Sequence, residues 1–184
     1  MNIRVSLFGT IALATTLTAA RFPERLMRHD STIVSACTAD SSFQRLAFWV
    51  GTWDVFDSTG TRYATQKVSA VLDACAVVAE WSGTRGDKGV SLSAFDPRAH
   101  EWKQMYTSNQ VPVQSGVSVR RSDSSYTGPG VRFVPLVGDM PMQTRVTILP
   151  LEGNRAAQLF EDSRDGGKTW HVQFKAEHRR ELMK

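Results

Sequence analysis

The fold of this chain is decided by one stretch near its N-terminus, Phe48-Trp49-Val50-Gly51-Thr52-Trp53-Asp54-Val55. From Gly51 onward the stretch has a period of two, because Gly51, Trp53 and Val55 share one face and the residues between them share the other. An alternation of this kind predicts a β-strand with one buried face. The stretch therefore predicts the first strand of a β-rich domain.

The residues that follow this strand form further short alternating segments separated by turn signals. Helical periodicity is nearly absent after Trp49, whereas residues 41–49 predict a short helix with Ser41 or Ser42 as its cap. Short strands joined by turns are typical of an antiparallel sandwich or barrel, and a closed meander leaves no strand edge exposed. We expect an all-β, up-and-down antiparallel barrel of roughly 8–10 strands with a short N-terminal helix. After the first strand, further strands are predicted at 62–72, 75–82, 90–95, 100–107, 114–121, 131–137, 143–149, 155–163 and 169–180.

Composition limits the classes of protein to which this chain can belong. Its 184 residues suit one domain, and a hydrophobic content of 41% is enough for a substantial core. The formal charge is +4, but the basic residues are scattered, with adjacent pairs only at Arg120-Arg121 and Arg179-Arg180. A nucleic-acid-binding domain normally shows a basic cluster with interleaved aromatic residues. We interpret the charge as surface solvation and expect no nucleic-acid partner.

The N-terminus has the three parts of a secretory signal peptide. Arg4 supplies the positive charge, Val5–Leu17 is an uncharged apolar run, and Thr18-Ala19-Ala20 provides small residues for cleavage. The run is shorter than the about 20 residues that span a bilayer, so we expect export without stable membrane insertion. The alternative is a buried N-terminal helix. The predicted organisation is a signal peptide at 1–20, a flexible leader at 21–40 and a barrel domain at 41–184, in a periplasmic or secreted protein.

The two cysteines, Cys37 and Cys75, gain meaning from the predicted export. In an oxidising compartment an even pair suggests a disulfide, which here would close a long loop and stabilise the fold by about 4 kcal/mol. Two buried free thiols are the alternative. Cys37 also ends a lipobox-like sequence, but the charged segment 21–30 separates it from the apolar run.

These motifs together resemble a bacterial family of exported, lipocalin-like domains of unknown function. The resemblance implies a calycin-type barrel, in which an arginine of a late strand packs over the tryptophan of the Gly-x-Trp motif. It thus implies structural roles for Gly51 and Trp53, with Arg179 or Arg180 against the Trp53 ring. This chain departs from the family pattern at Tyr106 and His178. The resemblance rests on the opening stretch and on Cys75, Glu80-Trp81, Gly89-Val90-Ser91, Phe95-Asp96, Trp102-x-Gln104, Glu161-x-Ser163-x-Asp165-Gly166-Gly167-Lys168-Thr169-Trp170 and Phe174.

The segment Ser163-x-Asp165-x-Gly167-x-Thr169-Trp170 also fits the Asp-box pattern of sialidase propellers. Propellers carry several such boxes, and this chain has one. We interpret it as a structural hairpin, in which Asp165 accepts backbone N–H groups, Gly167 takes a positive φ, and Trp170 packs under the turn.

The candidate ligand-binding residues are Trp102, Gln104 and Tyr106, which share one face of a predicted strand. Two aromatic rings with an amide between them suit a pocket that offers apolar contact and one hydrogen bond. We also place His178 near one end of this pocket. The alternative is plain core packing. The leading hypothesis is a barrel that binds a small, largely apolar molecule in its interior.

An enzyme that uses the same cavity is the second hypothesis, and a structural barrel with a filled core is the third. Glu80 and Glu161 lie beside aromatic residues, and a carboxylate inside the barrel could act as a general acid or base in isomerisation, cyclisation or hydrolysis. The alternative is that both face solvent. His171 or His178 could ligate haem, but the histidine spacing suggests no metal site, and we expect no cofactor.

Overall fold

The structure is a computed structural model that describes residues 36–110, 117–136 and 142–181. The signal peptide expected at 1–20 lies outside the described residues, as does most of the leader expected at 21–40. The described part of the leader is residues 36–40, which include α1 (Ala36–Ala39), and Cys37 is buried in the core. The folded domain therefore begins by residue 36.

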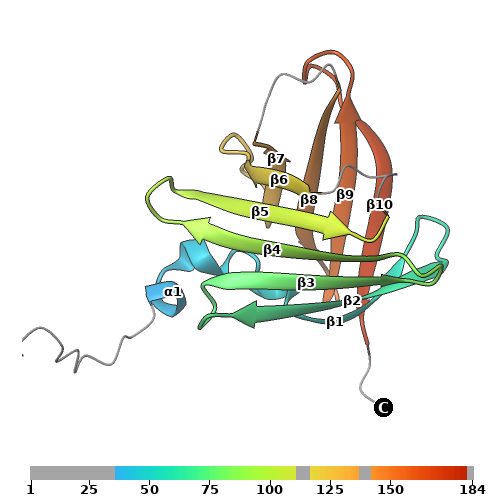
Figure 1. Cartoon of the computed structure of the whole chain (residues 1–184), viewed down its shortest axis with the longest axis horizontal. Helices are drawn as coiled ribbons and strands as arrows, with labels where there is room; N and C mark the ends of the chain where they lie inside the picture. The colour runs from blue at the N-terminus through green and yellow to red at the C-terminus, as the bar shows by residue number, and fades with distance from the viewer. Residues whose placement is uncertain (1–35, 111–116, 137–141, 182–184) are drawn as a thin grey trace, which may run out of the picture. The chain divides into compact units, whose positions relative to one another are not determined.

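Ten antiparallel strands form a closed barrel among the described residues (Figure 1). Each strand pairs with the next in the sequence, and β1 pairs with β10 to close the barrel. The predicted up-and-down all-β barrel is confirmed. The strands are β1 (Gly51–Phe56), β2 (Arg62–Val71), β3 (Ala76–Gly83), β4 (Lys88–Asp96), β5 (Glu101–Ser108), β6 (Val117–Ser122), β7 (Val131–Pro135), β8 (Gln143–Leu151), β9 (Arg155–Ser163) and β10 (His171–Arg180).

The helix predicted at 41–49 is instead two 3₁₀ helices, η2 (Ser41–Gln44) and η3 (Ala47–Trp49). The predicted cap was wrong, because Asp40 Oδ1 accepts the Ser42 N–H at 2.8 Å and caps η2. A carboxylate one residue upstream satisfies a free N–H group of the first turn. No helix in the described ranges is long and apolar enough to cross a membrane.

The segment from α1 to η3 covers one end of the barrel, which we call the closed end (Figure 1). The predicted disulfide is confirmed: Cys37 and Cys75 are bonded, with their Cα atoms 4.9 Å apart, and the bond ties this segment to the turn between β2 and β3. The ring of Phe43 packs edge-on against Phe95 at 5.1 Å between ring centres. These contacts build a filled apolar core at this end.

The tryptophan of the Gly-x-Trp motif packs against Arg180, as the resemblance implies. Trp53 is 1% exposed, and its Nε1 donates to the Trp49 carbonyl oxygen at 2.8 Å. The Arg180 guanidinium lies over the Trp53 ring, 4.5 Å from the ring centre. Gly51 has a φ of +148°, which favours glycine, and a Cβ atom there would collide with that guanidinium, so glycine leaves room for Arg180 over the ring. Arg179 instead faces outward, over Phe56.

The Asp-box segment forms the predicted hairpin between β9 and β10. Asp165 Oδ1 accepts the backbone N–H groups of Lys168 and Thr169 at 3.0 and 2.9 Å, and these bonds, led by that of Thr169, lower the pKa of the Asp165 carboxyl. Gly167 has a φ of +87°, and its carbonyl oxygen accepts Trp170 Nε1 at 3.0 Å. Every bond is local, so the motif is a structural turn.

Candidate functional site

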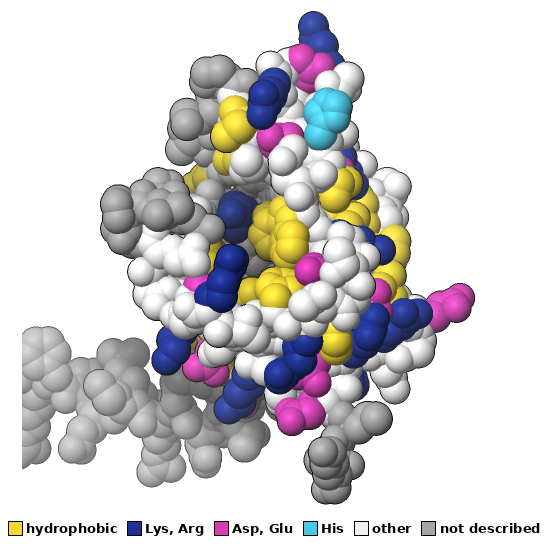
Figure 2. Space-filling model, turned by 90° about the vertical axis from the view of Figure 1, so that its right-hand side faces the viewer, with side chains coloured by type: hydrophobic (Ala, Val, Ile, Leu, Met, Phe, Trp, Pro, Cys, Tyr) yellow, Lys and Arg dark blue, Asp and Glu magenta, His cyan; other side chains and the backbone are white. Residues whose placement is uncertain are grey.

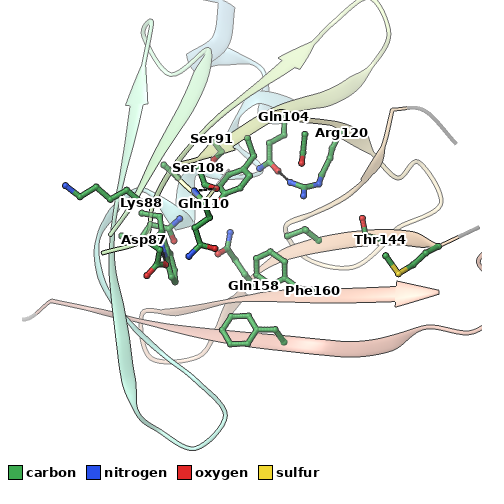
Figure 3. Close-up of a pocket in the computed structure, with 18 residues that line it drawn as sticks. Asp87, Lys88, Ser91, Gln104, Ser108, Gln110, Arg120, Thr144, Gln158 and Phe160 are labelled. Carbon is green, nitrogen blue, oxygen red and sulfur yellow. Dashed lines mark hydrogen bonds between the residues drawn. The ribbon is translucent and has the colours of Figure 1, made fainter. Parts of the chain in front are cut away.

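A cavity of about 660 Å³ occupies the barrel toward the end opposite the closed end. Its walls include the end of β3, the start of β4 and the end of β5, which meet there because neighbouring strands are antiparallel. Figure 2 shows a hollow with apolar side chains and a basic side chain in its wall, and Figure 3 shows the lining residues. They are Gln66, Ala79, Trp81, Asp87, Lys88, Ser91, Gln104, Tyr106, Ser108, Gln110, Ser118, Arg120, Met142, Thr144, Val146, Gln158, Phe160 and Phe174.

Aromatic rings form one wall of the cavity. Phe160 and Phe174 pack at 5.8 Å between ring centres, and Tyr63 behind them contacts both Phe174 and Trp81. Trp81 Nε1 donates to Asp87 Oδ2 at 2.8 Å, which holds the indole in place. Ring contacts and the Trp81–Asp87 hydrogen bond therefore order this wall before any ligand enters.

Gln104 and Tyr106 line the cavity, as the alternation of β5 predicts. Tyr106 has room because the neighbouring strand, β4, carries Gly89. A Cβ atom at that position would lie 2.6 Å from the Tyr106 hydroxyl oxygen. Gln104 is buried, and its Nε2 donates to Ser93 Oγ at 3.1 Å. The hydrogen bond orients the Gln104 carbonyl oxygen away from Ser93.

Arg120 on β6 supplies a cation to the cavity. Its Nη1 donates to Gln104 Oε1 at 3.2 Å, and burial lowers the pKa of its guanidinium. Among the described residues, no carboxylate forms an ion pair with Arg120. Arginine nevertheless stays protonated in proteins. The cavity thus contains a positive charge with an amide as its hydrogen-bond partner.

Trp102 does not line the cavity, so its predicted role was wrong. It is 1% exposed, and its Nε1 donates to the Ser42 carbonyl oxygen at 3.1 Å, which places it in the core at the closed end. Alternation correctly put Trp102 on the inner face of β5. Its depth along the barrel, which alternation does not report, makes it a packing residue.

His178 also lies in the core and does not line the cavity. Its ring is fully buried and packs edge-on against Trp49 and Trp53, at 6.4 and 6.2 Å between ring centres. Its Nε2 lies within hydrogen-bond distance of Gln66 Oε1, at 2.6 Å. Burial lowers the pKa of His178 to about 4. Gln66 lines the cavity, so His178 is one hydrogen bond removed from it.

Neither glutamate proposed as a catalyst faces the cavity. Trp81 and Phe160 point inward, and the residue after or before an inward residue points outward. Glu80 is therefore exposed. Glu161 forms a two-point ion pair with Arg145, at 2.8 Å for each contact, and this pair lowers the pKa of its carboxyl. Arg145 in turn stacks on Trp170, outside the barrel.

Arg120 is a lining residue that the sequence analysis does not predict, because it assigns the basic residues to surface solvation. Arg120 and Arg121 are neighbours on a strand, so one of them has to face inward if the strand belongs to a barrel. The register of β6 with β5, in which Arg120 pairs with Gln104, decides which one. The period of two in this short, polar strand was the signal that could have found it.

The described residues contain no group of three or more His, Cys, Asp or Glu side chains that could hold a metal ion. No protein-family model matches the chain, and no curated protein is significantly similar to it.

Proposed function

We propose that this protein is exported and binds a small molecule with an apolar body inside its barrel. The cavity is the observation that carries this proposal. Its volume of about 660 Å³ falls within the range of small-molecule sites, roughly 300–1,000 Å³. A barrel whose core served only packing would fill that space with side chains, as the closed end does.

The lining supports binding over catalysis. Asp87 is the carboxylate among the described lining residues, and it already accepts the indole N–H of Trp81. Glu80 and Glu161, the proposed acids or bases, lie outside the cavity. The lining thus offers rings and hydrogen-bonding groups that hold a molecule, and neither glutamate proposed as the acid or base lies among them.

Export and family membership belong to the same proposal. The Cys37–Cys75 disulfide supports export, because such bonds persist in oxidising compartments. The Arg180 guanidinium over Trp53 supports the resemblance to exported lipocalin-like domains, since that family was expected to share this arrangement.

The experiment is a titration with 1-pyrenebutanol, a neutral probe, followed by quenching of tryptophan emission. Trp81 lines the cavity, so Trp81→Phe should lose more of the quenching than Trp170→Phe, whose ring lies under Arg145 outside the barrel. Ser91→Phe should block the cavity and weaken binding, with thermal melting as the check on folding. Saturable quenching that survives Ser91→Phe unchanged would place the probe elsewhere and refute the proposal.

A further inference from the structure

We propose that the cavity selects a monoanionic ligand and that Arg120 binds the carboxylate of that ligand; this inference rests on the proposed binding function. Arg120 carries this inference because it lines the cavity, where the described lining contains no other arginine. Arg62, Arg145 and Arg155 lie near the outer surface and pair with Asp or Glu side chains. Arg120 points into the cavity and, among the described residues, forms no such pair.

The hydrogen bonds around Arg120 leave donors free to face the cavity. A guanidinium has five N–H donors, and one Arg120 donor bonds Gln104 Oε1. Ser93 orients Gln104 by accepting its Nε2. Figure 3 shows Gln104 and Arg120 joined on one side of the cavity, with Asp87 and Lys88 on another. The hydrogen bond to Gln104 therefore orients the guanidinium, and its other N–H donors face the cavity.

The charge balance of the lining favours an anion. Arg120 and Lys88 are positive and Asp87 is negative, so the titratable lining residues carry one more positive than negative charge. Withdrawing a cation from water is unfavourable unless an opposite charge or hydrogen bonds offset the lost solvation. An anion that enters the cavity supplies both.

The geometry of the group points to a carboxylate on an apolar body. The planar fork of a guanidinium matches the two oxygens of a carboxylate. A dianionic phosphate would call for further cations, and Lys88 lies across the cavity from Arg120 (Figure 3). Trp81, Phe160 and Phe174 supply an apolar surface for the remainder of the molecule.

The test compares 1-pyrenebutyrate with 1-pyrenebutanol, which share the aromatic body and differ in charge. Wild type should bind the acid at least about tenfold more tightly than the alcohol, and Arg120→Met should remove that preference, as expected for loss of a charge-assisted hydrogen bond. Affinity for the alcohol should change less than about threefold, because Arg120 makes no charged contact with it.

Arg121→Met is the matched control, since it removes the same charge from the adjacent, exposed position and should leave both affinities unchanged. Lys88→Met tests the other cation of the lining. Arg120→Lys keeps the charge without the fork and should retain part of the preference. Arg120→Lys also takes the place of Arg120→Met in the test if thermal melting shows that Arg120→Met does not fold.

The outcomes separate this inference from the proposed function. Equal wild-type affinities for acid and alcohol would leave the binding function standing and overturn the carboxylate assignment. A preference that is lost in Lys88→Met but kept in Arg120→Met, or undiminished in Arg120→Lys, would also overturn it. Equal loss of affinity for both probes in the Arg120 variants would overturn it as well. If neither probe binds wild type, the proposed function and this inference both fail.

Discussion

Acid should destabilise this protein through His178, a residue with no exposed surface. The pKa of His178 is lowered from 6.5 to about 4 in the fold, because burial among Trp49 and Trp53 disfavours the charged imidazolium. The unfolded chain therefore takes up the proton first as the pH falls. The titration of His178 leaves the free energy of unfolding unchanged above pH 6.5 and lowers it as the pH drops below that value. Below about pH 4, His178 causes no further decrease.

The magnitude follows from the same two pKa values. A difference of this size corresponds to a loss of about 3 kcal/mol between pH 6.5 and pH 4. Carboxyl groups complicate the lower part of the window, because ion pairs lower the pKa of Glu161 and Glu177, and their stabilisation is lost as the pH falls below the ordinary carboxyl range. The upper part of the window reports histidine titration.

The assay is urea unfolding at a series of pH values for wild type, His178→Phe and His171→Gln. Phe keeps a ring between the two tryptophans and cannot titrate, so the free energy of unfolding of His178→Phe should change less than that of wild type as the pH decreases toward 5. His171→Gln should follow wild type, because His171 is exposed at the other end of β10. Parallel pH profiles for wild type and His178→Phe would refute the reasoning.

Three further changes test the closed end. Trp53→Ala should lower the free energy of unfolding by about 3–5 kcal/mol in urea titrations, and a loss under about 1 kcal/mol would contradict the packing described. Gly51→Ala should lower the free energy of unfolding by about 1–3 kcal/mol. Gly60→Ala should cost less, because φ is also positive there but an added Cβ meets no atom. The difference between the two variants should shrink when Arg180 is also changed to Ala. Reduction of Cys37–Cys75 should cost about 4 kcal/mol, and thiol titration of the unfolded, unreduced protein should detect no free cysteine.

The fold was predictable because its signals are local. Alternation gives the face of a strand and turn residues give its ends, so the barrel and the inward Gln104 and Tyr106 followed from the sequence. Depth and register are not local. Trp102 belongs to the core because β5 begins at the closed end, and His178 meets Trp53 only because β10 returns to pair with β1, Val55 opposite His178. The inward position of Arg120 depends on the pairing of β6 with β5.

The position of the polar residues along the barrel is itself an argument for a bound molecule. Apolar side chains fill the closed end, and the inner face then changes to the amides of Gln66, Gln104 and Gln158, with Arg120 beside Gln104. Buried amides and charges destabilise a fold unless each finds a partner. Gln66 has His178 and Gln104 has Ser93, whereas Arg120 has one amide contact and a cavity in front of it. Deviations from good packing concentrate at functional sites, so this end of the barrel is where binding variants should be made.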